Sequence, residues 1–119
     1  DVAEMSLSFE NIFCIDNIVG FKSLTKLQLD NNIIERIQGL DELVNLTWLD
    51  LSFNNISKIE GLDKLVNLTD LSLFNNHIER IENLDACVNL HVLSVGNNKI
   101  SNLEDVRYNS TTDPRTTIN

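Results

Sequence analysis

The sequence predicts an α/β solenoid: a right-handed coil of stacked units, with short parallel strands on its concave face and 3₁₀ or irregular turns on its convex face. The first observation behind this prediction is that apolar positions recur with a period of 22 residues. The second is that, within each unit, the spacing of these positions changes from two residues to three. The third is that four Gly and one Pro are too few to reverse a 119-residue chain by ordinary turns.

The repeated unit reads L-x-x-L-x-L-x-x-N-x-I-x-x-I-x-x-L-x-x-L and occurs four times in succession. Units begin near residues 24, 46, 68 and 90, and a degenerate copy begins near residue 2, with Glu10 where the others have Asn. This is the pattern of the leucine-rich repeat, and we predict a repeat domain over residues 1–106. Three of its aligned columns are Leu27, Leu49, Leu71 and Leu93; Asn32, Asn54, Asn76 and Asn98; and Ile34, Ile56, Ile78 and Ile100.

The spacing within a unit predicts its local structure. Leu27 and Leu29 alternate as in a strand with one buried face, so each strand is expected to centre on such a pair. Ile37, Leu40 and Leu43 then recur every third residue, which suits 3₁₀ turns better than an α-helix. Parallel strands about 4.8 Å apart would place the apolar columns of neighbouring units in one shared core.

Two polar columns predict how the chain turns. The Asn32 column supplies a carboxamide that can satisfy backbone groups left unpaired inside the coil, so Asn→Ala there is expected to cost stability. A second column holds only residue types that tolerate a positive φ, and we predict that it forms the left-handed hinge of each coil. Its members are Asn17, Gly39, Gly61, Asn83 and Asp105.

The repeat pattern fails after Val106, where the core columns would hold polar residues. We therefore predict that residues 107–119 form a polar tail that is not a repeat and that no further strand follows. A solenoid needs a cap over its last apolar face. Either the tail covers that face through Tyr108 and Ile118, or the chain is part of a longer protein; the low apolar content of the tail favours the second.

Composition and charge exclude several classes of partner. Eighteen acidic and nine basic residues give a net charge of -9, which repels nucleic acid and anionic membranes because the cations are not clustered. No run of about 18 apolar residues exists, and residues 1–9 lack the pattern of a signal peptide. We expect protein partners, with no nucleic acid, no membrane and no small-molecule substrate.

No pattern typical of catalysis, a metal or a cofactor is present. His77 and His91 have no Cys or second His at ligand spacing, and phosphate loops, nucleophile elbows and paired catalytic carboxylates are missing. Cys14 and Cys87 lie three units apart, about 14 Å at strand spacing, beyond the roughly 7 Å that a disulfide spans between α-carbons. We expect a non-enzymatic protein with two free thiols, in a reducing compartment.

The candidate binding site is the concave strand face, where outward positions alternate with core leucines. Trp48 is the most informative residue, because Trp is enriched in interface hot spots; Phe74, Asp50 and Asp70 are expected beside it. Phe53, near a strand end, either joins the site or covers an edge by packing on Asn or Ile side chains. The predicted protein-binding residues are Trp48, Asp50, Asp70, Phe74, Lys26, Gln28, Asp30 and Phe53.

The stretch from Phe21 to Leu103 also carries a more specific resemblance. Its strings LQLDNNII, WLDLSFNNI and LSLFNNHI closely resemble the leucine-rich-repeat subunits of the nexin–dynein regulatory complex of motile cilia and flagella. The resemblance implies an axonemal scaffold in the cytoplasm and cytoskeleton of a cilium or flagellum, where it helps to control dynein-driven motility. Its implied partners are other subunits of the dynein regulatory complex.

A second hypothesis rests on strings shared with another family. LDLSFNNI and IEGL also resemble the regulatory subunits that wrap protein phosphatase 1, which implies a regulator of a phosphatase or another cytosolic enzyme. Such a regulator would use the same concave face to control catalysis in its partner. A third class, the extracellular recognition repeat, lacks its expected cysteines. The residues leave the first two hypotheses open.

Overall fold

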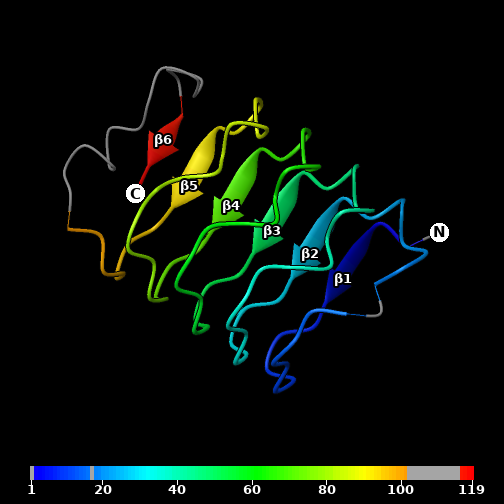
Figure 1. Cartoon of the computed structure of the whole chain (residues 1–119). Helices are drawn as coiled ribbons and strands as arrows, with labels where there is room; N and C mark the ends of the chain where they lie inside the picture. Colours follow the sequence, from blue (N-terminus) through cyan, green and yellow to red (C-terminus); the bar gives the residue numbers. More distant parts are fainter. Residues whose placement is uncertain (1, 17, 102–115) are drawn as a thin grey trace.

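The computed structural model describes residues 2–16, 18–101 and 116–119, which form one sheet of six strands in chain order (Figure 1). Every neighbouring pair is parallel, so the chain is a parallel-stranded solenoid of about five turns. Its right-handed sense stays a prediction. The strands are β1 (Glu4–Ser6), β2 (Lys26–Gln28), β3 (Trp48–Asp50), β4 (Asp70–Ser72), β5 (Val92–Ser94) and β6 (Thr117–Ile118).

The register of the sheet follows the 22-residue period. Leu27 pairs with Leu49, which pairs with Leu71, and the two flanking residues of each of these strands are only half-buried. Each strand is therefore centred on the first leucine of its pair and not between the two. The ladder continues beyond the strand, because the amide of Leu29 donates to the carbonyl of Asp50 at 2.8 Å.

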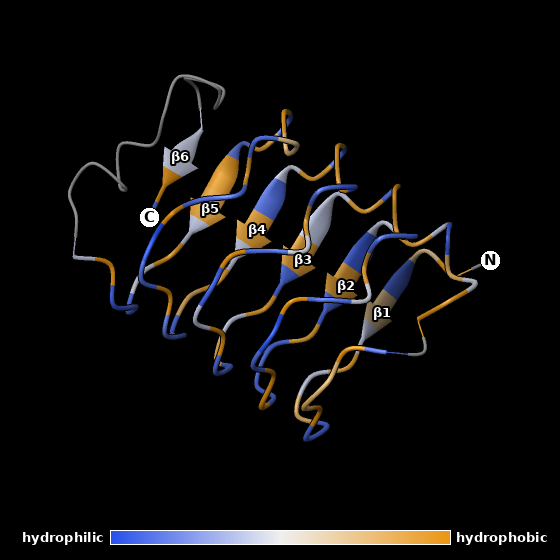
Figure 2. Ribbon diagram, viewed as in Figure 1, coloured by the Kyte–Doolittle hydropathy of each residue, from blue (hydrophilic) through white to orange (hydrophobic). Residues whose placement is uncertain are grey.

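The core is one hydrophobic cluster, formed by the stacked apolar columns of neighbouring coils. The Leu and Ile columns of the four regular units are almost all buried, and the degenerate first unit contributes Ile15 and Ile18. Figure 2 shows hydrophobic residues at equivalent places in successive coils, as a core shared between neighbours requires. The end units supply side chains that are only partly buried, namely Met5, Leu7, Ile12, Phe21, Ile100 and Ile118.

The convex wall consists of turns and bends, and no helix occurs in the described residues. The amide of Leu43 donates to the carbonyl of Leu40 at 3.0 Å, and the amide of Leu46 donates to that of Leu43 at 3.1 Å. The next two coils repeat both bonds at the equivalent positions. Turns that each close over three residues explain why the apolar stripe of this wall has a period of three.

The Asn column performs the predicted role. The Oδ1 of Asn54 accepts from the amide of Ile34 at 3.0 Å, and its Nδ2 donates to the carbonyls of Leu29 and Leu51, both at 3.0 Å. Asn54 is buried, so it satisfies backbone groups of two adjacent coils where water does not reach. Equivalent bonds form at Asn32, Asn76 and Asn98.

The predicted hinge column is confirmed at Gly39, Gly61 and Asn83, all with positive φ. Asn17 and Asp105 lie outside the described residues. A second column of residues with left-handed backbone conformation lies after the strands. The sequence did not predict it, because two of its members are phenylalanines, which rarely adopt this conformation. It consists of Phe9, Asn31, Phe53, Asn75 and Asn97, with φ between 54 and 59°.

The prediction that no strand follows residue 106 is wrong. Thr117–Ile118 form β6, which pairs in parallel with β5 and places Ile118 opposite Leu93. Ile118 packs against the core, so the alternative in which the tail covers the last apolar face holds for this residue. Tyr108, the other residue of that alternative, lies outside the described part, and the domain boundary at 106 stays a prediction.

Candidate functional site

The outward positions of β2 to β5 form two rows across the concave face. The first row contains Lys26, Trp48, Asp70 and Val92, and the second contains Gln28, Asp50, Ser72 and Ser94. All eight are half-buried, whereas the leucines between them are buried. The alternation predicted from the sequence therefore places Trp48, Lys26, Gln28, Asp50 and Asp70 on this face.

Trp48 has a cation over its ring. The Nζ atom of Lys26, its register partner on β2, lies 4.6 Å from the centroid of the Trp48 ring. This distance is typical of a cation–π contact. On the other side of β3, Asp70 is in register with Trp48, so the indole stands between a basic and an acidic residue.

Phe74 does not lie beside Trp48, and the expectation that it does is wrong. Trp48 is the first residue of β3 and pairs with Asp70, whereas Phe74 comes two residues after the end of β4. Phe74 is thus four residues beyond Asp70 along the chain, or roughly 13 Å at the rise of a strand. The two aromatic residues mark opposite ends of the concave face.

Phe74 belongs instead to an aromatic edge with Phe53. Their ring centroids are 5.7 Å apart with an interplanar angle of 62°, an edge-to-face contact. Phe53 thus contacts Phe74, another of the predicted binding residues, and its part in binding stays a prediction. Both side chains keep more than a third of their surface exposed, at 45% for Phe53 and 38% for Phe74.

The three candidate carboxylates differ in how many of their oxygen atoms already accept hydrogen bonds within the protein. Asp30 is used at both oxygens, which accept from Ser8 Oγ at 2.7 Å and from Asn31 Nδ2 at 2.8 Å. Asp50 accepts the amide and the hydroxyl of Ser52 through the same Oδ1. Asp70 Oδ1 lies 2.8 Å from the Thr69 hydroxyl, whose single proton the Thr47 carbonyl also attracts, so the fold uses Asp30 most and Asp70 least.

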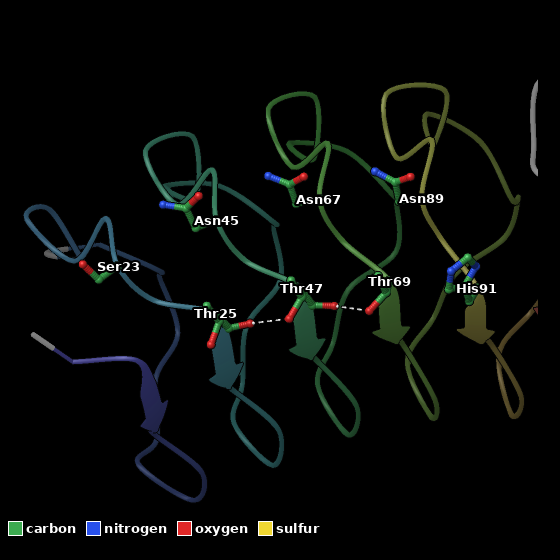
Figure 3. Close-up of a pocket in the computed structure, with 8 residues that line it drawn as sticks. All are labelled: Ser23, Thr25, Asn45, Thr47, Asn67, Thr69, Asn89 and His91. Carbon is green, nitrogen blue, oxygen red and sulfur yellow. Dashed lines mark hydrogen bonds between the residues drawn. The ribbon is translucent and has the colours of Figure 1, made fainter.

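A polar groove that the sequence did not single out runs along the edge where the strands begin (Figure 3). Thr47 Oγ1 donates to the carbonyl of Thr25 at 3.1 Å, and Thr69 Oγ1 donates to that of Thr47 at 2.9 Å. Asn45 and Asn67 likewise donate to backbone carbonyls of the preceding coil. These bonds tie neighbouring coils together, so the polar lining of the groove stabilises the stack. The groove is lined by Ser23, Thr25, Asn45, Thr47, Asn67, Thr69, Asn89 and His91.

Both cysteines are free, as their spacing predicts. Cys14 is half-buried, and its Sγ accepts from Gln38 Nε2 at 2.8 Å. Burial of Cys87, aided by the negative charge of Asp63, raises the pKa of its thiol to about 11. Cys87 therefore stays protonated at neutral pH and is a poor nucleophile.

The other charged and titratable side chains of the described part are exposed or half-buried. His77 and His91 are exposed, and Arg36 Nε lies 3.4 Å from Glu60 Oε2 in an ion pair. No group of three or more His, Cys, Asp or Glu side chains within the described ranges could hold a metal ion. The described part also contains no helix with the length and apolarity that crossing a membrane requires.

Comparison with protein-family models matches residues 44–86 and 66–108 to a family described as leucine-rich repeats in two copies. No curated protein sequence matches the chain. Among solved structures, internalin C2 from Listeria monocytogenes aligns over 99% of this chain and 52% of its own, with 27% identity and a TM-score of 0.82.

Two further solved structures have the same repeat architecture. An internalin F from Listeria monocytogenes aligns over 82% of this chain and 28% of its own, with 31% identity and a TM-score of 0.73. A leucine-rich-repeat protein of Leptospira interrogans aligns over 82% of this chain and 25% of its own, with 29% identity and a TM-score of 0.73. The chain spans between a quarter and about half of the length of these three proteins.

Proposed function

The chain belongs to the leucine-rich repeat family, and we propose that it is a non-enzymatic scaffold that binds proteins through its concave face. The observation that carries this proposal is the position of Trp48, a half-buried residue outside the core cluster, between Lys26 and Asp70. The core needs Leu49, which is 1% exposed, and not its neighbour Trp48. A large aromatic side chain that lies outside the core cluster, on a concave surface, is suited to anchor a partner.

The more specific proposal is that the chain is a subunit of the axonemal nexin–dynein regulatory complex. It is supported by the strings LQLDNNII, WLDLSFNNI and LSLFNNHI, which include all of β3, two residues each of β2 and β4, and the turns that follow these strands. In this role the chain would lie in the cytoskeleton of a cilium or flagellum, bind other subunits of the complex and help to control dynein-driven motility.

The second candidate is a regulatory subunit of a protein phosphatase or another cytosolic enzyme. LDLSFNNI and IEGL, which favour it, fall in the third unit, around β3 and the wall that follows. This candidate uses the same concave face, so both roles share Trp48 as the expected anchor. They differ only in the partner.

Affinity purification of the chain from ciliated cells, followed by mass spectrometry, tests both levels of the proposal. We expect other axonemal proteins to be recovered with the wild type and lost with Trp48→Ala, since a hot spot contributes more than about 2 kcal/mol. Val66→Ala is the matched control, because Val66 is exposed in a turn outside the concave face. Recovery of a phosphatase catalytic subunit without axonemal proteins would support the second candidate against the first.

A further inference from the structure

A shallow depression crosses the concave face from β3 to β5, beside the Trp48 ring. It has a volume of about 140 Å³, which is enough for one side chain of a partner. The depression is lined by Trp48, Leu49, Asp70, Leu71, Ser72, Val92 and Ser94.

Three residues of the first row set the chemistry of this depression. Trp48, Asp70 and Val92 are in register on adjacent strands, so an aromatic ring and an aliphatic side chain flank a carboxylate. At about 4.8 Å between strands, the Trp48 and Val92 backbones are roughly 10 Å apart, with Asp70 midway. A flat, positively charged group suits such a site, because it can stack on the ring and pair with the carboxylate.

The contact between Lys26 and Trp48 shows that this ring accepts a cation. The Lys26 ammonium lies over the ring from β2, and the depression opens on the opposite side, toward β4 and β5. A second cation on the far side of the ring would meet the repulsion of Lys26. Asp70 offsets this repulsion, because its carboxylate lies on the side of the depression.

The Asp70 carboxylate has capacity left for such a partner. Its Oδ1 accepts from Thr69 Oγ1 at 2.8 Å, but that hydroxyl also lies 2.9 Å from the carbonyl of Thr47 and has only one proton to donate. Among the described residues, the ion pair found joins Arg36 to Glu60, and no Lys, Arg or His side chain of these residues forms an ion pair with Asp70.

The charge around the depression also favours a basic partner. Asp50 and Asp70 lie on adjacent strands of this face against the single ammonium of Lys26, and the whole chain has a net charge of -9. Such a surface attracts positively charged segments over several ångströms and disfavours acidic ones.

These observations, on the premise of the proposed function, point us to a specific occupant. We infer that the concave face binds a basic segment of a partner protein and that an arginine of this segment enters the depression. Its guanidinium stacks on Trp48, its methylene groups contact Val92, and its N–H groups donate to Asp70.

The test uses Trp48 as the reporter, because it is the only Trp in the chain. The whole chain is titrated with the peptide acetyl-Gly-Gly-Arg-Gly-Gly-amide and, separately, with its citrulline analogue, which has the same shape without the charge. We expect the arginine peptide to change the Trp48 fluorescence and the NMR signals of the Trp48 indole N–H and the Val92 methyls saturably. The citrulline peptide should bind at least about fivefold more weakly.

The variants Asp70→Asn and Asp41→Asn separate a local site from a general charge effect. Each removes one negative charge, but Asp70 lines the depression, whereas Asp41 is exposed in a turn of the convex wall. We expect Asp70→Asn to weaken the arginine peptide about fivefold and Asp41→Asn less than about twofold, with melting temperatures equal to that of the wild type. Equal losses in the two variants, equal binding of the two peptides or no saturable change would overturn the inference.

A purified natural partner distinguishes this inference from the proposed function. If Trp48→Ala loses the partner and Asp70→Asn retains it at wild-type strength, the concave face binds proteins and the basic occupant is wrong. If Trp48→Ala itself retains the partner, the proposed role of the concave face fails.

Discussion

The ring of Phe74 lies directly over Gly96, so a Cβ atom at position 96 would be 3.0 Å from Phe74 Cε1 and 3.1 Å from Cδ1. Gly61 is crowded in a different way, because a Cβ atom there would be 2.5 Å from the backbone carbonyl oxygen of Ile37. Gly61 also has a φ of 73°, which side chains rarely adopt. The two glycines are thus needed for different reasons: one leaves space for an aromatic ring, and the other lets the backbones of two coils approach.

This difference predicts that replacing each glycine by alanine lowers the free energy of unfolding by different amounts. Gly96→Ala should lower the free energy of unfolding by less than about 1 kcal/mol, because the exposed Phe74 ring can swing away. Gly61→Ala should lower it by more than about 2 kcal/mol, because a backbone carbonyl cannot move aside and a left-handed alanine costs about 1–2 kcal/mol. Denaturant titrations of both variants measure the order, and a larger loss in Gly96→Ala would contradict it.

Phe53 should be replaceable by asparagine without loss of stability. Its φ of 58° costs a phenylalanine about 1–2 kcal/mol, whereas Asn tolerates this conformation and occupies the equivalent position in Asn75. The edge contact with Phe74, worth about 0.5–1.5 kcal/mol, would be lost. We therefore expect a net change within about 1 kcal/mol in thermal or chemical unfolding.

The reverse substitution, Asn75→Phe, is the control for Phe53→Asn. It places a phenylalanine at φ of 59° and should destabilise the protein. A loss of more than about 1 kcal/mol in Phe53→Asn would instead show that the aromatic edge stabilises the coil.

Trp48 and Leu49 should separate binding from folding. Leu49→Ala opens a cavity in the shared core and should cost about 2–5 kcal/mol, whereas Trp48→Ala loses mainly the contact with Lys26, worth about 0.5–1 kcal/mol at a partly exposed site. Thermal melts of the two variants check this order. A loss in Trp48→Ala as large as that in Leu49→Ala would identify Trp48 as a structural residue.

Asn54→Ala should be among the most destabilising polar substitutions in the chain. It leaves the buried Ile34 amide without its acceptor and removes the donor to three carbonyls, and each unsatisfied buried group costs about 1–3 kcal/mol. Asn55 is exposed and provides the matched control. Equal melting temperatures for Asn54→Ala and Asn55→Ala would refute the role of the Asn ladder.

Cys87 should make stability depend on pH in alkaline solution. Its pKa is about 11 in the folded protein, against an ordinary value of 9.0 that applies to the unfolded chain. Between these values the unfolded chain loses the proton while the folded protein keeps it, so the free energy of unfolding falls as the pH rises from about 9 to 11. Below pH 9 both states are protonated, and this contribution is fully present.

The variant Cys87→Ala isolates the contribution of this thiol. Its free energy of unfolding should fall less steeply than that of the wild type over the same pH range, because other groups that titrate there are common to both proteins. Parallel pH dependences for the two proteins would show that the Cys87 pKa is not raised.

The sequence by itself determined the contacts between equivalent positions of neighbouring coils. Leu49 meets Leu27 and Leu71, and Asn54 bonds to the preceding coil, because every such contact joins residues about one period apart. A repeat displays these contacts as columns, so the parallel register, the shared core and the outward position of Trp48 could all be predicted.

Only the tertiary structure decided the contacts between different columns. The rings of Phe74 and Phe53 meet edge to face. Phe53 aligns with Asn75 and Phe74 aligns with Gly96, so no column of the repeat contains this contact. The left-handed backbone of Phe53 likewise contradicts its residue type, because the turn shared with Asn31 and Asn75 imposes the conformation.

For the candidate site, too, some features could be predicted from the sequence and others required the structure. Alternation within one strand placed Trp48 and Asp70 on the concave face. The 22-residue period, which aligns Trp48 with Asp70, already puts Phe74 four residues farther along the chain than the partner of Trp48. The structure was needed to show that Lys26 covers one side of the indole. The last strand, β6, was also decided by the fold, because a two-residue segment such as Thr117–Ile118 is too short to carry a strand pattern but can still pair through its backbone when a neighbouring strand offers an open edge.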